Sequence, residues 1–208
     1  MVALPAIVSA LLAYLLGSVN GSLLLGRLRG VDIRTMGSGN AGGTNALRTQ
    51  GPWFAAGAVI IDVLKGYVAV KWFGMPTTTA QWLPEACAAA AVVGHVYPVW
   101  HGFRGGKGAA TLLGTLAALA PWLLMVAVVA WLLCMFVTGF VGLSTMIAAA
   151  ILPLVSLLRG APLLSNRVLF LAALAVFVVF THRSNIARMR SGEEPRSRRL
   201  WLLGRSQG

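Results

Sequence analysis

Long apolar segments recur along this chain of 208 residues, and they constrain its fold more than any other feature. The runs cover residues 2–26, 53–73, 84–100, 109–158 and 168–180. Only 11% of the residues are charged and the mean hydropathy is +0.79, whereas a soluble domain carries about a quarter charged residues. Because about 20 consecutive apolar residues cross a bilayer as a helix, the sequence predicts a multi-span membrane protein.

The distribution of positive charge predicts how the chain is oriented. Thirteen of the 17 Lys and Arg residues lie in three polar segments, at residues 27–51, at 101–108 and in the tail from residue 183. By the positive-inside rule these segments are expected on the cytoplasmic side. We therefore interpret the net charge of +12 as an orientation signal and a contact with anionic lipid, and we expect no nucleic-acid partner.

The number of crossings depends on residues 109–158. At about 1.5 Å per residue they would make roughly 75 Å of helix, against an apolar core about 30 Å thick. Lys107 before them is expected inside and Arg159 after them outside, so the number of crossings is odd. Three crossings broken at Pro121 and at residues 138–139 fit best. The prediction is an all-α protein of about seven transmembrane helices, with the N-terminus outside and the C-terminus cytoplasmic; five spans would keep the same sidedness.

Residues 1–194 are expected to form a single membrane domain, followed by a basic cytoplasmic tail at residues 195–208. Cys87 and Cys134 lie inside apolar runs without metal-ligand spacing, which favours buried small side chains over a disulfide or a metal site. The first apolar run has no basic segment before it, since the first cation is Arg27. It is expected to be a retained span and not a cleaved signal peptide.

The first polar segment reads Gly-Ser-Gly-Asn-Ala-Gly-Gly-Thr-Asn at residues 37–45. Its glycines let backbone N–H groups approach an anion, and its hydroxyl and amide groups add donors. A flexible turn is the alternative, but a plain turn rarely carries so many donors beside an arginine. The residues expected to bind here are Gly37, Ser38, Gly39, Asn40, Thr44, Asn45 and Arg48.

The second segment reads Gly-Gly-Lys-Gly at residues 105–108 and opens a helix. Gly105, Gly106 and Gly108 are expected to present backbone N–H groups to a phosphate, and Lys107 to add a point cation. The pattern is not a Walker A loop, because His101 stands where that loop needs glycine, so nucleotide hydrolysis is not implied. A basic turn that reaches lipid headgroups is the alternative.

The third segment, residues 181–188, begins at the cytoplasmic end of the last apolar run. If it is helical, His182 and Asn185 share one face, where each could bind a polar substrate. Anchoring at the membrane interface by the arginines is the alternative. Within the second apolar run, Asp62 and Lys65 are expected to form an intrahelical ion pair, with a proton or ion pathway as the alternative.

These motifs together resemble the bacterial acyl-phosphate:glycerol-3-phosphate acyltransferase family, which are small integral enzymes of the inner membrane. The resemblance runs from the first apolar run to about Glu194 and includes the three segments above, in order and at matching spacing. The departures are Gly43, where the family more often has Ala, and Gly142, where a Ser is common.

The resemblance implies a seven-helix enzyme that transfers a fatty acyl group from acyl phosphate to glycerol 3-phosphate at the cytoplasmic face. The products are lysophosphatidic acid and phosphate, and no metal or other cofactor is expected. Membrane lipids are expected partners, and a soluble enzyme that makes acyl phosphate is a candidate partner. The implied catalytic residues are Ser38, Lys107, His182 and Asn185. To the binding residues named above, the resemblance adds Ser144, Arg183 and Glu194.

A direct attack of the glycerol hydroxyl is favoured over an acyl-enzyme, because no Ser-His-Asp set is apparent. Either His182 or the departing phosphate takes the proton. The alternative function, from another class, is a small phosphate or organophosphate transporter. A transporter would be expected to carry polar groups near the bilayer midplane and an internal repeat, whereas the polar motifs here cluster on one side.

Overall fold

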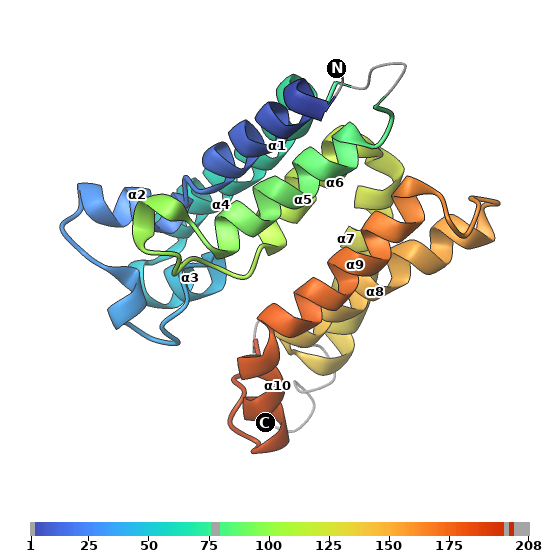
Figure 1. Ribbon diagram of the computed structural model, residues 1–208. Coiled ribbons are helices and arrows are strands. Elements are labelled where there is room, and N and C mark those ends of the chain that lie inside the picture. The colour runs from blue at the N-terminus through green and yellow to red at the C-terminus, as the bar shows by residue number, and fades with distance from the viewer. Residues whose placement is uncertain (1–2, 76–79, 198–199, 202–208) are drawn as a thin grey trace. The chain divides into compact units, whose positions relative to one another are not determined.

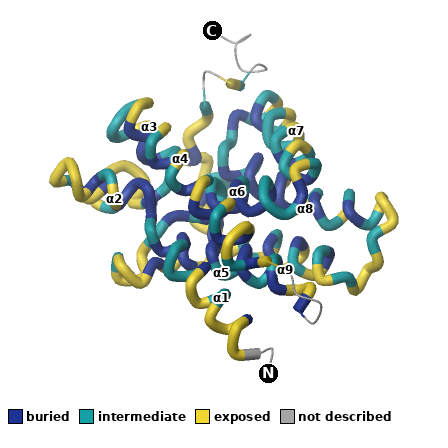
Figure 2. Tube along the Cα trace, turned by 90° about the horizontal axis from the view of Figure 1, so that it is seen from above, coloured by how far each residue is buried: buried dark blue, intermediate teal, exposed yellow. Residues whose placement is uncertain are grey.

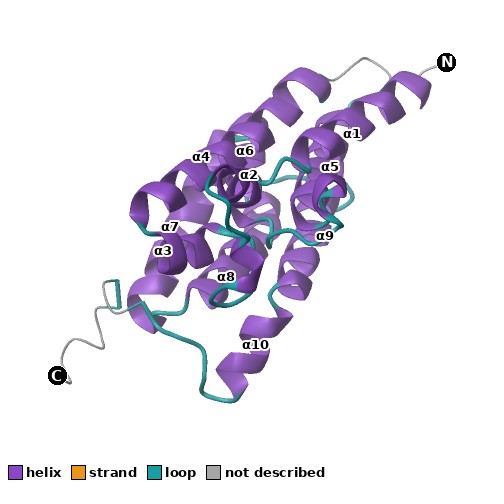
Figure 3. Ribbon diagram, turned by 90° about the vertical axis from the view of Figure 1, so that its left-hand side faces the viewer, coloured by secondary structure: helices purple, strands orange, loops and turns teal. Residues whose placement is uncertain are grey.

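The computed structural model describes residues 3–75, 80–197 and 200–201, so Val2 and residues 198–199 and 202–208 of the predicted basic tail lie outside the described residues. In this part of the chain the regular elements are helices and no β-strand occurs (Figure 3). The all-α class predicted from the sequence is therefore confirmed. The helices form two compact units, Met1–Pro121 and Trp122–Gly208, which are described separately.

In the first unit, four apolar helices lie side by side (Figure 1). Helix α1 (Ala3–Gly17) packs against α5 (Leu83–Val96), and α4 (Pro52–Val68) packs against α6 (Ala109–Leu119). The α4 helix continues as a short π-helical segment, Ala69–Phe73. Glycine allows both close approaches, because a Cβ at Gly17 would overlap the backbone of Ala91 and a Cβ at Gly114 would overlap that of Val63. Small residues at helix contacts are typical of membrane proteins.

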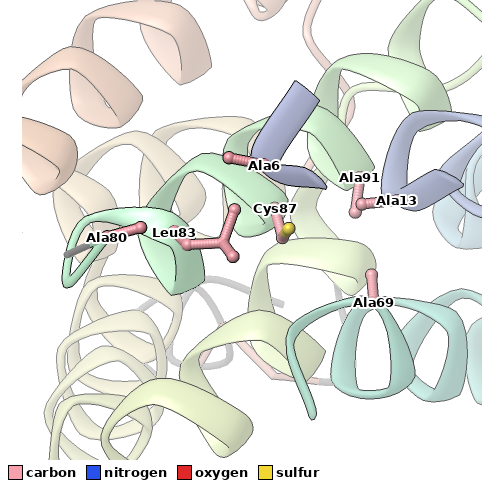
Figure 4. Packing of buried hydrophobic residues seen from close by; sticks show 7 residues of the cluster. All are labelled: Ala6, Ala13, Ala69, Ala80, Leu83, Cys87 and Ala91. Atoms are coloured by element: carbon pink, nitrogen blue, oxygen red, sulfur yellow. The ribbon is translucent and has the colours of Figure 1, made fainter. Parts of the chain in front are cut away.

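The buried core between α1, α5 and the π-helical segment is made mostly of alanine (Figure 4). Figure 4 shows Ala13 and Ala91 pointing toward each other, with Ala69 and Cys87 nearby. Cys87 is fully buried, as the sequence predicts, whereas Cys134 is only partly buried. This core explains how α1 and α5 can pack closely with few large side chains between them.

Short elements gather at one end of this unit (Figure 1). They are α2 (Gly21–Leu28), the 3₁₀ turns Ile33–Thr35 and Val99–His101, and α3 (Gly43–Gln50). The chain bends by 46° between α1 and α2. Asn20 begins α2 because its Oδ1 accepts a hydrogen bond from the N–H of Leu23 at 3.1 Å, which is the role of an N-cap.

The second unit contains α7 (Pro121–Thr138), α8 (Val141–Leu158), α9 (Asn166–Thr181) and α10 (Arg183–Arg190), with α8 packed against α9. The predicted breaks at Pro121 and residues 138–139 are confirmed, because α7 begins at that proline and Gly139 lies between α7 and α8. Residues at every fourth position of α7 form an exposed apolar stripe: Met125, Val129, Leu133 and Val137. Such a stripe suits contact with lipid.

Three described helical stretches are long and apolar enough to cross a membrane by themselves: Pro52–Phe73, Pro121–Thr138 and Val141–Leu158. Counting each of two bent helix pairs as one span raises the number to five, and α6 is a shorter apolar helix. Figure 2 shows α1 exposed along much of its length, and the apolar side chains of Leu4 and Ile7 are among the exposed ones. The chain is therefore a multi-span membrane protein, and the count of seven spans stays a prediction.

Candidate active site

The first glycine loop, which we define as residues 36–42, is organised by Asn45 of α3. The Oδ1 of Asn45 accepts a hydrogen bond from the N–H of Ser38 at 2.9 Å. Its Nδ2 donates to the carbonyl oxygens of Ile33 at 3.1 Å and Met36 at 3.0 Å. Both amide hydrogens of Asn45 are thus used inside the protein. Asn45 shapes the loop that carries Ser38, whereas the sequence analysis expected it to bind substrate directly.

The loop leaves its other predicted groups accessible. Ser38 and Arg48 are exposed, and Asn40 and Thr44 are partly buried. Gly37 and Gly39 have φ values of +55° and +71°, in the left-handed region that glycine adopts without steric cost. Glycine at both positions therefore fits the shape of the loop as well as the predicted approach of an anion.

The second glycine loop, residues 102–108, is fixed to the C-terminal end of α5. The N–H of Gly105 donates to the carbonyl of Val96 at 3.0 Å, and the N–H of Gly106 donates to the carbonyl of His95 at 3.2 Å. Since each backbone N–H has a single hydrogen, these two groups are occupied and are not presented to a phosphate. This corrects the expectation for Gly105 and Gly106, which hold the loop in place and bring partly buried Lys107 to the start of α6.

Arg34 joins the two glycine loops. Its Nη1 donates to the carbonyl oxygens of His101 at 2.8 Å and Arg104 at 3.2 Å, both in the segment that leads to Lys107. Its Nη2 pairs with Asp32 at 2.8 Å, and this bond lowers the pKa of Asp32 and raises that of Arg34. The sequence carries no local sign of this clamp, because the residues that it joins are about 70 positions apart.

A second contact brings the same loops together. Asn20, at the break between α1 and α2, donates from Nδ2 to the carbonyl of Ala41 at 3.1 Å. A Cβ on Gly106 would lie 3.0 Å from that carbonyl oxygen and would overlap the ring of His95. The backbones of the two loops are therefore in close contact. The position of Asn20 directly before α2 is a capping signal that sequence reasoning could have used.

His101, to which the sequence analysis assigned no role, lines a cavity of about 370 Å³ together with Arg27 and Arg34. Partial burial lowers the pKa of His101, and the two neighbouring arginines lower it further. Its imidazole is therefore neutral at pH 7.

In the second unit, His182 lies at a 53° bend between α9 and α10. Its Nδ1 is 2.8 Å from the carbonyl oxygen of Val178. Because a carbonyl oxygen only accepts, this contact assigns the ring proton to Nδ1 in the neutral imidazole. Nε2 is then the nitrogen that can accept a proton or a hydrogen bond. The carbonyl of Val178 therefore orients the His182 ring. The nearby carboxylate of Glu194 bonds instead to two other side chains of α10.

Those residues are Asn185 and Arg188. The carboxylate of Glu194, which is 8% exposed, accepts from Asn185 Nδ2 at 2.6 Å and from Arg188 Nε at 2.7 Å. Glu194 was expected to bind substrate, and in the structure each of its two oxygens holds one of these side chains. A Cβ on Gly142 would lie 2.8 Å from Asn185 Cγ, which explains why glycine suits position 142 in this chain.

Two further predicted binding residues are placed in this unit. Ser144 is fully buried and donates from Oγ to the carbonyl of Phe140 at 2.9 Å. Arg183 is exposed, with its guanidinium over the ring of Phe180 at 4.6 Å. In the described residues no group of three or more His, Cys, Asp or Glu side chains is placed to hold a metal ion.

The structure thus gathers the first two motifs in one unit and His182, Asn185, Ser144 and Glu194 in the other. The glycerol-3-phosphate acyltransferase family model matches residues 7–192, almost the whole chain. This chain belongs to that family. A glycerol-3-phosphate acyltransferase of Synechococcus elongatus is 43% identical over 201 residues, covering 93% of this chain and 95% of the relative. One of Listeria welshimeri is 40% identical over 194 residues, covering 91% of this chain and 96% of the relative.

Two crystal structures of the integral membrane glycerol 3-phosphate acyltransferase PlsY (YgiH) have the same fold. The glycerol 3-phosphate form has a TM-score of 0.83 and 34% identity, covering 92% of this chain and 95% of that one. The lysophosphatidic acid form has a TM-score of 0.82 and 34% identity, covering 95% and 98%. Together with the sequence relatives, they identify this chain as an integral membrane acyltransferase.

Proposed function

We propose that this protein transfers a fatty acyl group from acyl phosphate to glycerol 3-phosphate, which gives lysophosphatidic acid and phosphate. The observation that carries the proposal is the likeness to an acyltransferase whose structures are named for glycerol 3-phosphate and for lysophosphatidic acid. Acyl phosphate as the donor is supported by the motif resemblance. This reaction is the first acylation step of phospholipid synthesis.

In the proposed reaction, a hydroxyl oxygen of glycerol 3-phosphate attacks the carbonyl carbon of acyl phosphate. A carbon–oxygen ester bond forms, and the bond between the carbonyl carbon and the phosphate oxygen breaks, so phosphate leaves with the bonding electron pair. Nearby donors stabilise the negative charge that develops on the carbonyl oxygen. The hydroxyl proton passes to His182 Nε2 or to the departing phosphate, and an acyl-enzyme is not needed.

The roles follow from the chemistry of each group. The first glycine loop, with exposed Ser38 and partly buried Asn40 and Thr44, is assigned to acyl phosphate. Arg48 and Lys107 supply the positive charge for the phosphate of glycerol 3-phosphate. His182, whose Nδ1 hydrogen is held by a carbonyl, and Asn185 are assigned to the glycerol part.

The orientation belongs to the same proposal. We expect seven spans, with the N-terminus outside and the site facing the cytoplasm of a bacterial inner membrane. The support is the clustering of cations at residues 27–51, 101–108 and 183–205, which the positive-inside rule places in the cytoplasm. Both substrates are phosphates, so a cytoplasmic site faces the compartment where they are expected to form.

Product detection tests this function. Purified protein in detergent is given acyl phosphate and glycerol 3-phosphate, and lysophosphatidic acid and phosphate are measured together. Equal amounts of the two products are expected, with acyl-CoA inactive as a donor. The matched control is Lys107→Ala, in which loss of a charge-assisted bond should lower the rate roughly tenfold to a hundredfold. Turnover with acyl-CoA alone would refute the donor, and no turnover with either donor would refute the function.

A further inference from the structure

Helices α4 and α5 both belong to the first unit (Figure 1), and three ionisable side chains that they carry are buried and in contact with one another. They are Asp62, Lys65 and His95, with exposed fractions of 1%, 4% and 2%. Lys65 Nζ pairs with Asp62 Oδ1 at 2.8 Å, so the intrahelical ion pair predicted from the sequence is confirmed. The participation of His95 was not predicted.

The hydrogen bonds of Lys65 are complete. Its ammonium group has three hydrogens and three acceptors: Val19 O at 2.7 Å, Asp62 Oδ1 at 2.8 Å and His95 Nδ1 at 2.9 Å. His95 Nδ1 accepts from this ammonium group in the tautomer that carries the ring proton on Nε2. The same nitrogen also lies 3.3 Å from Asp62 Oδ1, a longer contact than its 2.9 Å contact with Lys65. The cluster balances one positive and one negative charge, as buried ions require.

On one side, the cluster holds the break between α1 and α2. Asp62 Oδ1 accepts from the N–H of Gly21 at 3.0 Å, and Lys65 holds the carbonyl of Val19. Asn20 lies between these two residues and donates to the carbonyl of Ala41 in the first glycine loop. The ion pair thus holds Val19 and Gly21, the two neighbours of Asn20, and Asn20 contacts this loop.

On the other side, the cluster supports the second glycine loop. The carbonyl of His95 accepts from the N–H of Gly106. The imidazole lies directly behind Gly106, where a Cβ would overlap Nε2. The residue after Gly106 is Lys107. A continuous set of contacts therefore runs from the loop of Ser38, through the ion pair, to the loop of Lys107.

We propose that Asp62, Lys65 and His95 are positioning residues, which set the register of the Ser38 loop against the Lys107 loop for acyl transfer. This inference rests on the proposed function. Stability alone is a weak reason for such a cluster, because replacing a buried ion pair by well-packed apolar residues of similar volume is often neutral or stabilising. Alignment of the two loops is a stronger reason, because a misplacement of reacting groups by about 1 Å can lower the rate a hundredfold.

A single and a double variant separate two roles of the cluster, the alignment of the loops and the balance of buried charge. Lys65→Gln leaves the Asp62 carboxylate without its cation, so its melting temperature should fall. The double variant Asp62→Asn/Lys65→Gln has no buried charge and keeps an acceptor for Gly21, and Gln offers two N–H donors where Lys65 offers three. Its melting temperature should recover most of that loss. Its kcat should stay about tenfold or more below that of the wild type, while the KM for glycerol 3-phosphate changes by less than about threefold.

The matched control is Lys71→Met, which removes an exposed cation that follows α4 and should change neither kcat nor KM. A double variant that regains wild-type kcat along with its stability would show that the cluster is merely structural. A double variant with unchanged kcat and a raised KM for glycerol 3-phosphate would also contradict the positioning role.

His95→Asn is the second variant, for the case that the double variant does not fold. It offers Lys65 an amide oxygen in place of Nδ1 but puts no ring behind Gly106. We expect a folded protein with reduced kcat, and wild-type kcat would overturn the proposal. Wild-type protein is run in the same assay, so that inactivity of the wild type marks failure of the proposed function, separately from failure of the positioning role.

Discussion

Removing the charge of Glu194 should disturb Asn185, which its carboxylate holds. In the structure the Glu194 carboxylate is 8% exposed and accepts from Asn185 Nδ2 at 2.6 Å and from Arg188 Nε at 2.7 Å. In Glu194→Gln, the side-chain amide has one oxygen and one NH₂ group. If the Gln oxygen accepts from Arg188, its NH₂ group faces Asn185 Nδ2, and Asn185 must turn its amide over or lose the bond. If the Gln oxygen accepts from Asn185, Arg188 loses its bond. In either case one of the two present bonds is lost.

The size of the effect follows from the kind of bond. A hydrogen bond to a charged group contributes about 1.5–3 kcal/mol. For a chain of this size each kcal/mol shifts the melting temperature by about 2–4 °C, so Glu194→Gln should melt about 3–12 °C lower. If Asn185 then loses its orientation, kcat/KM should fall about tenfold or more.

Thermal unfolding in detergent and initial rates with glycerol 3-phosphate measure the two effects. Glu193→Gln is the matched control, because Glu193 is the neighbouring carboxylate, is exposed, and accepts from Ser191 Oγ at 3.0 Å. If Glu194→Gln and Glu193→Gln were indistinguishable in melting temperature and in rate, Glu194 would not hold Asn185, and the reasoning would be refuted.

Three further predictions follow. Single cysteines placed near Arg48, Lys107 and His182 in a cysteine-free background should resist an impermeant thiol reagent added to intact cells; labelling of any one site would contradict a cytoplasmic site. His182→Gln should keep partial activity, because an amide oxygen can replace Nε2 as the acceptor, and its KM for glycerol 3-phosphate should rise more than kcat falls; a loss confined to kcat would instead indicate a general base. The bond to Arg34 lowers the pKa of Asp32 below 3.8, so this carboxylate stabilises the fold above that pH and ceases to do so as the pH falls through its lowered pKa. Asp32→Asn should therefore melt below wild type at neutral pH, with the difference shrinking as the pH falls below 3.8; a constant difference would contradict this.

Local sequence determined the helical class and the helix breaks. Apolar runs in a bilayer must satisfy their backbone hydrogen bonds internally, so they form helices. Pro121 and Gly139 interrupt the longest run, and the structure divides it there. The ion pair of Asp62 and Lys65 was also predictable, because residues three apart share a helix face. The three motifs likewise pointed to the family on their own.

Only the tertiary structure decided what the polar groups of those motifs do. Sequence reasoning assigned Asn45, Gly105 and Gly106 to substrate, but their hydrogens bond to nearby backbone carbonyls. A donor looks the same in sequence whether the folded chain uses it or leaves it for a ligand. That difference depends on where the carbonyls lie in space.

The same holds for the contacts that join the loops. Arg34 reaches the carbonyls of His101 and Arg104, and Lys65 of α4 reaches Val19 and His95. Each contact joins residues 30 or more positions apart, and most end on a backbone oxygen, which every residue possesses. The sequence therefore carries no local mark of them. They exist because close packing of small residues brings α1, α4, α5 and α6 within reach of one another.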